Sequence, residues 1–231
     1  MRILYKPIVA YKWSTPNPEL EIEEAGRVCW ESWGRSDGTT ECAQEFIRRL
    51  KRVGHMDVME EAELSVWIEC SRTCSHQIVR HRTQHHLQAS QRYIKAKEPE
   101  IMMPPSIASA GDMVRMEYLN QVEEAYKTYN FLSAAGIRKE DARFVLPNAA
   151  LTKLKAKGNF SNWRKFFSLR SDSASQWEIQ MVSNSILEIA YNLAPSVFED
   201  LYEQYLESPL LSTNHPMADI AHKEEFSNGW S

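Results

Sequence analysis

The chain has 231 residues, of which 43% are hydrophobic and 25% charged, and its formal net charge is -4 at pH 7. With only 8 glycines and 10 prolines, this composition excludes collagen-like and low-complexity proteins and is typical of a folded soluble domain. The mild negative charge argues against bulk nucleic-acid binding, and no apolar run approaches the ~20 residues of a membrane helix.

The N-terminal third predicts alternating strands and helices. Residues 2–12 alternate loosely and indicate a strand instead of a signal peptide, so we expect a cytoplasmic protein. The segment "PNPELEIEEAGRVCWESW" has helical spacing, and Thr40 is placed to cap a second helix that ends near Gly54. "AELSVWIEC" alternates as a strand, after which Ser71 or Thr73 caps a helix through about residue 79.

The remainder of the chain is mostly helical by its periodicity. The predicted helices cover residues 117–135, 139–146, 161–169, about 175–193 and 195–206. Between the second and third of these, "ALTKLKAKG" alternates as a strand with a lysine-rich outer face. Ser175 and Glu178 have the spacing of a capping box. We expect one α+β domain over residues 1–231 in which helices outnumber strands, with a less ordered tail after about residue 209.

The segment "RHRTQHHLQASQRY", from Arg80 to Tyr93, concentrates three arginines and three histidines in fourteen residues. A metal site is one interpretation, because His81 and His85 stand four residues apart. However, Arg82 occupies the place where a metalloprotease motif has glutamate, and arginines beside the imidazoles repel a dication. Cys70 and Cys74 have no second pair at a zinc-ribbon spacing, so we expect buried thiols and no metal.

A second interpretation of this segment is a nucleic-acid patch, in which arginines contact phosphates and Tyr93 stacks on a base. Acidic residues outnumber basic residues over the whole chain, which disfavours it. A solvated charged loop accounts poorly for the neutral donors and acceptors mixed with the arginines: Gln77, Gln84, Gln88, Ser90 and Gln91. Arginine binds phosphate bidentately while amides and hydroxyls complete the contacts, so the mixture indicates a small phosphorylated ligand.

Four ordered blocks resemble the flavin-dependent thymidylate synthases. Arg80-His81-Arg82, seven residues and then Ser90 match the family signature, and "SQRY" continues it. "GHMDVMEE" from Gly54, "ARFVLP" from Ala142 and "LRSDSASQWEI" from Leu169 match the other blocks. The resemblance extends over roughly residues 20–200.

The resemblance implies a single α+β domain with helices around a small mixed or antiparallel sheet, assembled as a homotetramer with shared active sites. It implies C5-methylation of dUMP to dTMP, with methylenetetrahydrofolate as carbon donor and reduction by NADPH through FAD. No cysteine nucleophile is needed in this chemistry. The partners are therefore small molecules and copies of the same chain, without nucleic acid or membrane.

Site residues follow from the matched positions. Arg170 matches the arginine that favours ionisation of the uracil ring, which is the catalytic role. The nucleotide-binding positions are Gln77, Arg80, Gln88, Ser90, Gln91, Arg92, Arg143 and Arg170. The flavin-binding positions are His55, Glu60, Arg80, His81, Arg82 and Asn159. No residue is assigned to a metal.

The chain departs from the family pattern mainly around the flavin. Gln88 stands where glutamate is general, Ala174 where histidine is frequent and Lys165 where asparagine is frequent. These departures keep alternatives open: a relative that methylates UMP or transfers hydroxymethyl in specialised nucleoside biosynthesis, or a non-catalytic protein that binds nucleotides or nucleic acid. Product analysis separates the first two, and flavin absorbance separates an enzyme from a binding module.

Overall fold

The computed structural model describes residues 1–96 and 98–207, so the tail expected after about residue 209 lies outside the described ranges. Its centre is a four-stranded antiparallel sheet in the order β2 (Ile8–Ser14), β3 (Glu63–Ser71), β6 (Leu151–Asn159) and β4 (His85–Gln88). A separate parallel pair joins β1 (Arg2–Leu4) to β5 (Glu100–Met102). The predicted α+β architecture is confirmed.

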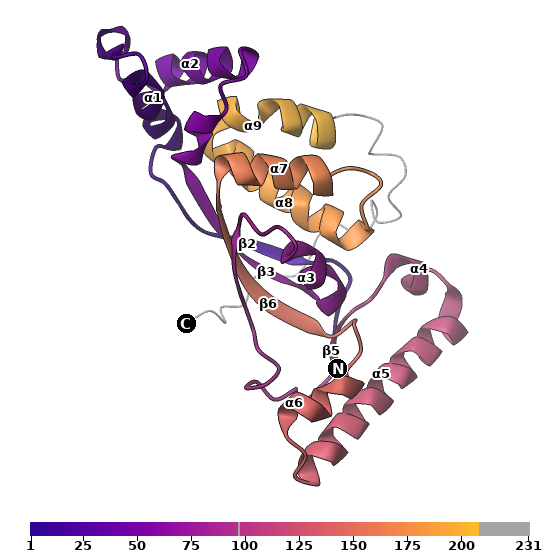
Figure 1. Ribbon diagram of the computed structural model, residues 1–231. Coiled ribbons are helices and arrows are strands. Elements are labelled where there is room, and N and C mark those ends of the chain that lie inside the picture. Colours follow the sequence, from indigo (N-terminus) through magenta and orange to yellow (C-terminus); the bar gives the residue numbers. More distant parts are fainter. Residues whose placement is uncertain (97, 208–231) are drawn as a thin grey trace.

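The helices pack around this sheet. They are α1 (Pro18–Val28), α2 (Thr40–Arg52), α3 (Arg72–Ile78), α4 (Pro105–Ala108), α5 (Gly111–Ala134), α6 (Lys139–Ala142), α7 (Phe160–Arg170), α8 (Trp177–Leu193) and α9 (Pro195–Tyr202). Short helical turns are η1 (Trp33–Arg35), η2 (Asp57–Glu60), η3 (Arg143–Val145) and η4 (Glu203–Glu207). Figure 1 shows α1 and α2 at one end of the molecule and α5 and α6 at the other, with α7–α9 between them. No helix in the described ranges has the length and apolar character needed to cross a bilayer.

The core lies between the sheet and α7, α8 and α9. Alternation in β3 turns Leu64, Val66 and Ile68 inward, where they are fully or almost fully buried. The buried aromatic side chains of α7, including Trp163 and Phe167, pack in the same core cluster. The end of α7 and the beginning of α8 are therefore held against the sheet, and Arg170 lies at this junction.

Three predicted boundaries were wrong for local reasons. The strand expected over residues 2–12 is two strands in different sheets, interrupted before β2 at Pro7, which lacks an N–H for a ladder. Thr39, and not Thr40, caps α2 by accepting from the N–H of Cys42. The helix expected from residue 117 begins at Gly111. The alternative cap Ser71 is the one used at α3, where its side chain accepts from the N–H of Cys74.

The predicted capping box at α8 was also wrong. Gln176 caps this helix, because its side-chain oxygen accepts from the N–H groups of Glu178 and Ile179. Glu178 instead points into the core, where both carboxylate oxygens bind Ser71. The edge strand β4 was not predicted within the arginine- and histidine-rich segment, because four residues give too little alternation to recognise.

Candidate functional site

Arg170 and His81 form the centre of the site. Arg170, the last residue of α7, donates a hydrogen bond from Nε to His81 Nε2 over 2.8 Å. Burial, followed by the nearby charges of Arg170 and His86, lowers the pKa of His81 to about 4. The imidazole is therefore neutral at pH 7 and accepts at Nε2, so it orients a guanidinium without neutralising its charge.

Two predicted nucleotide contacts lie on the elements next to this pair. Gln77, on α3, donates from Nε2 to the side-chain oxygen of Gln176 over 3.4 Å. Gln88, at the end of β4, donates from Nε2 to the hydroxyl oxygens of Ser75 at 2.9 Å and Thr152 at 3.2 Å. The amide of Gln88 is thus tied to α3 and β6, and its position is set by two hydroxyls.

Gln91 and Arg143 are brought together in a hollow of about 260 Å³. The rest of its lining is Arg72, His76, Phe144, Leu146, Pro147 and Asn148, so no acidic side chain takes part. Burial, and then the charge of Arg143, lowers the pKa of Arg72. Two cationic side chains thus face one small space. We call it the Arg72–Arg143 hollow.

Ser90 and Gln91 also line a larger hollow of about 510 Å³, in which Glu69, Glu98 and Glu100 accompany Lys95 and Lys153. The mixed charge of this lining makes it a poorer anion site than the Arg72–Arg143 hollow. Arg92 is half-exposed and its Nε pairs with Glu140 over 2.7 Å. An incoming phosphate would therefore compete with Glu140 for this arginine.

The loop that carries Arg80 and Arg82 presents both side chains to solvent. Immediately after it, Gln84 is 6% exposed, and neither polar atom of its amide has a hydrogen-bond partner. Nε2 of His86 is likewise buried and unpaired. Buried polar groups are normally paired, so these atoms favour a bound polar ligand or ordered water at this place. Donors and acceptors beside two free guanidinium groups fit a flavin, with its polar ring edge and its phosphates.

The three remaining predicted flavin contacts lie on other elements. His55 packs edge-on against Trp30, with ring centroids 5.6 Å apart, and lines a hollow of about 740 Å³ beside α1 and α2. No other predicted site residue lines this hollow. Glu60 ends η2 and is exposed. Asn159 caps α7 by accepting from the N–H of Asn162 at 2.8 Å, which gives its side chain a structural role.

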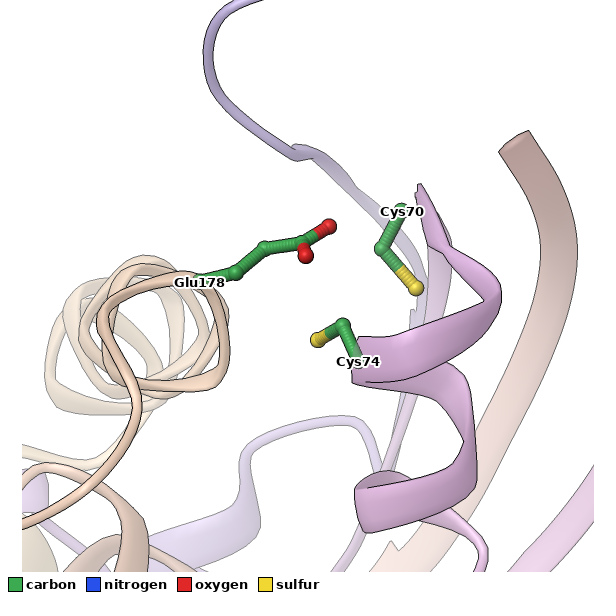
Figure 2. Close-up of side chains that lie close together, drawn as sticks. All are labelled: Cys70, Cys74 and Glu178. Atoms are coloured by element: carbon green, nitrogen blue, oxygen red, sulfur yellow. The ribbon is translucent and has the colours of Figure 1, made fainter. Parts of the chain in front are cut away.

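Cys70, Cys74 and Glu178 form a buried cluster at the junction of β3, α3 and α8. Figure 2 shows the carboxylate of Glu178 pointing toward the two thiols, and the three ligand atoms lie within 4.8 Å of one another. Both oxygens of Glu178 already accept from Ser71, from its N–H at 2.7 Å and its hydroxyl at 2.5 Å. A hydrogen bond with Cys70, together with burial, raises the pKa of the Cys74 thiol. These groups are thus satisfied as they stand, and the absence of a metal stays a prediction.

Comparison with known proteins places the chain in a family. The family model described as "Thymidylate synthase complementing protein" matches residues 9–196. A flavin-dependent thymidylate synthase of Geobacter sulfurreducens is 34% identical over 203 residues, covering 84% of this chain and 87% of that protein. The chain belongs to the flavin-dependent thymidylate synthase family. A further member, from Mycobacteroides abscessus, is 32% identical over 206 residues and covers 81% of this chain and 82% of its own length.

The fold of the chain also matches a solved structure. It is the UMP/dUMP methylase PolB from Streptomyces cacaoi bound with 5-Br dUMP, with a TM-score of 0.78 at 22% identity. The match covers 89% of this chain and 98% of PolB. At this identity the match establishes the shared fold.

No site role was predicted for Arg72, His76 or Glu178, although Glu178 lies in the matched block that begins at Leu169. Arg72 and His76 are four residues apart in "SRTCSHQ", so they share one face of α3, and this spacing was the available signal. The local pattern was misleading for Glu178, because its spacing from Ser175 predicted a capping role at the helix surface and not burial. Its burial depends on which strand end packs against α8.

Proposed function

We propose that the protein methylates C5 of dUMP to form dTMP, taking a methylene group from methylenetetrahydrofolate and two electrons from NADPH. Family membership supports this proposal, and the observation that carries it is the Arg170–His81 hydrogen bond. A guanidinium held by a neutral imidazole keeps its full positive charge. Beside the uracil oxygens, that charge stabilises a pyrimidine anion and makes C5 nucleophilic.

Bound FAD, once reduced by NADPH, would supply the hydride that turns the transferred methylene into a methyl group. The residues that would hold it are the exposed Arg80 and Arg82, with the unpaired amide of Gln84 and Nε2 of His86 as ring contacts. His81 would lie between the two ligands, because its Nε2 accepts from Arg170, the residue proposed to contact the uracil ring. The methylene carbon forms its bond to C5 and leaves tetrahydrofolate, after which C5 loses its proton to a base or to water. Because the charge of Arg170 activates C5, the proposed cycle uses no protein nucleophile.

We further propose a homotetramer whose active sites are shared between subunits. The motivation is that His55 lines a hollow to which none of the other predicted residues contributes. A partner subunit would complete the site by bringing its own His55 and Glu60 to the Arg80–Arg82 loop. We keep the cytoplasm as the proposed location, because the phosphorylated substrate is charged and does not cross lipid.

UMP is a second candidate substrate, because the fold matches a protein described as a UMP/dUMP methylase. The decisive experiment incubates the purified protein with dUMP or UMP, methylenetetrahydrofolate, FAD and NADPH, followed by mass analysis of the nucleotide. Formation of dTMP supports the proposal, methylated UMP supports the second candidate, and hydroxymethylated product indicates incomplete reduction. A colourless protein that ignores added FAD and leaves both nucleotides unchanged overturns the proposal and favours a binding module.

A further inference from the structure

We infer that Glu178 is a positioning residue for the nucleotide site. Its carboxylate holds the first turn of α3 against α8 and thereby fixes the position of Gln77, near the end of α3. Glu178 is buried and acts through hydrogen bonds inside the protein, without touching a ligand. The inference rests on the proposed function, because Gln77 is one of the proposed nucleotide contacts.

The geometry of α3 depends on its neighbours, because this helix has only seven residues, Arg72–Ile78. A helix this short does not hold its shape in water on its own. Gln77 lies in its last turn, and the loop that follows carries His81, the partner of Arg170. A shift of the first turn of α3 therefore displaces site residues at the other end.

Glu178 supplies one of the four acceptors that the start of α3 needs. The first N–H groups of a helix have no partner within it and depend on acceptors from elsewhere. The N–H of Ser71 donates to Glu178 Oε1 over 2.7 Å. The three N–H groups that follow donate to the carbonyl oxygens of Ala150 and Asn148 and to the hydroxyl of Ser71. Of these four acceptors only Glu178 belongs to α8, so its carboxylate links the two helices at this end.

The link between Glu178 and Ser71 is double and buried. Figure 2 shows the side chain of Glu178 extending from α8 toward Cys74, in the first turn of α3. Glu178 Oε2 accepts from the hydroxyl of Ser71 over 2.5 Å, and that hydroxyl accepts from the N–H of Cys74 over 3.0 Å. A buried carboxylate is costly unless its oxygens are hydrogen-bonded. Glu178 therefore favours the one arrangement of α3 that brings both donors of Ser71 to it.

The same turn of α8 also meets the other end of α3. Gln176 caps α8 by accepting from the N–H groups of Glu178 and Ile179, each at 3.2 Å. The same oxygen of Gln176 accepts from Gln77 Nε2 over 3.4 Å. This last hydrogen bond is long, so Gln77 can exchange it for a nucleotide contact. The first turn of α8 thus contacts α3 at both ends, and Glu178 sets the distance between them.

The test is calorimetric titration of the full-length protein with dUMP. Glu178→Ala should weaken dUMP binding about fivefold, as expected for one lost hydrogen bond from Gln77. Removing a negative charge would by itself strengthen the binding of an anion, so weaker binding points to a change of position. Glu178→Gln can accept from the N–H of Ser71 and donate to its hydroxyl oxygen, so this variant should keep most of the affinity.

A double-mutant cycle separates positioning from a general loss of stability. If Glu178 acts through Gln77, Glu178→Ala should weaken dUMP binding little further in protein that already carries Gln77→Ala. Ile186→Val shortens a fully buried side chain about two turns further along α8 and is the control for destabilisation. It should leave the dUMP affinity unchanged in both backgrounds. Ser71→Ala removes one of the two hydrogen bonds to Glu178 and should give a smaller loss in the same direction.

Wild-type affinity in folded Glu178→Ala and Ser71→Ala proteins overturns the inference. An undiminished loss in the Gln77→Ala background, or an equal loss in Ile186→Val, overturns it as well. If neither Glu178→Ala nor Ser71→Ala folds, the role of Glu178 is structural and the inference is wrong. Wild-type protein that binds neither dUMP nor UMP overturns the proposed function together with this inference. Binding without dTMP formation overturns the proposed methylation of dUMP alone, because the affinity cycle still decides the role of Glu178.

Discussion

Arg170 Nε donates a hydrogen bond to His81 Nε2 across 2.8 Å, joining residues that are 89 positions apart in the chain. The two residues come from separate blocks of the sequence, the end of α7 and the loop after α3. Their contact places the charge of Arg170 beside the loop that carries Arg80 and Arg82.

Arg170→Ala should reduce kcat by ~10²-fold or more and weaken nucleotide binding much less. Charge stabilisation that matters mainly in the activated state lowers the rate more than ground-state affinity. Steady-state rates at saturating dUMP and a direct binding titration measure the two effects. Arg48→Ala serves as the control, and wild-type rates in the Arg170 variant would remove it from the activating role.

Two inactive variants should restore activity to each other if sites are shared. In a homotetramer of either variant, His55→Ala or Arg170→Ala, every site is damaged. In mixed tetramers that assemble at random, about a quarter of the sites contain neither substitution. Co-expression with two affinity tags, purification of the mixed species and a turnover assay measure this. Activity no greater than that of either variant alone would show that each site belongs to one chain.

The free energy of unfolding should decrease as the pH is lowered from about 6.5 to about 4, in part because of His81. Its pKa is about 4 in the folded chain and near 6.5 when unfolded, so in this window the unfolded state binds more protons. The contribution is present above the unfolded pKa, is lost as the pH falls, and reaches at most ~1.4 kcal/mol per pH unit. Burial lowers the pKa of His86 too, which adds a slope of the same sign.

Denaturant titrations at several pH values measure this effect. His81→Asn should flatten the slope, whereas His76→Asn, at an exposed position, is the control and should not. An equal slope in His81→Asn and wild-type protein would contradict a buried neutral imidazole.

Single Cys→Ser substitutions at Cys29, Cys42, Cys70 and Cys74 should leave substantial turnover, because the proposed chemistry needs no thiol. Cys70 and Cys74 are fully buried, so their variants should lose about 1–3 kcal/mol of unfolding free energy while the exposed Cys29 variant loses little. A turnover assay, denaturant titration and elemental analysis measure activity, unfolding free energy and bound metal, respectively. A folded, ligand-binding variant without activity would indicate covalent attack, and one tightly held metal ion per chain that both core substitutions release would contradict the expected absence of a metal.

Gln88→Glu should shift the substrate preference toward dUMP by about fivefold in the ratio of kcat/KM values, as one exchanged hydrogen bond allows. A carboxylate only accepts, whereas the amide can donate to a ribose 2′-hydroxyl by releasing Ser75 or Thr152, to which its Nε2 now donates. The hydroxyl of Thr152, which now accepts from Gln88, can turn and donate to the carboxylate instead, whereas Ser75 would first have to release the carbonyl of Arg72. The carboxylate therefore keeps one partner, and the change should be tolerated. Both ratios are measured beside the exposed control Gln204→Glu, and a ratio that stays constant or moves toward UMP would refute the role of Gln88.

Local patterns along the chain were enough to predict the α+β class, most of the helices and the family. Periodicity is a local property, so α2, α7 and α9 and the strands β3 and β6 could be located to within a few residues. The signature Arg80 to Ser90 is likewise read along the chain, since its residues are fixed by spacing.

Which of these residues come into contact depends on long-range packing, which local patterns do not predict. Glu178 binds Ser71 across 107 positions, and Arg72 faces Arg143 in one hollow, although nothing in either local pattern selects that neighbour. Spacing along a helix assigns a residue to a face but leaves open what covers that face. The packing of α8 against the end of β3 makes that choice, because burying the apolar stripe of α8 also buries Glu178, whose carboxylate then needs a partner in the core.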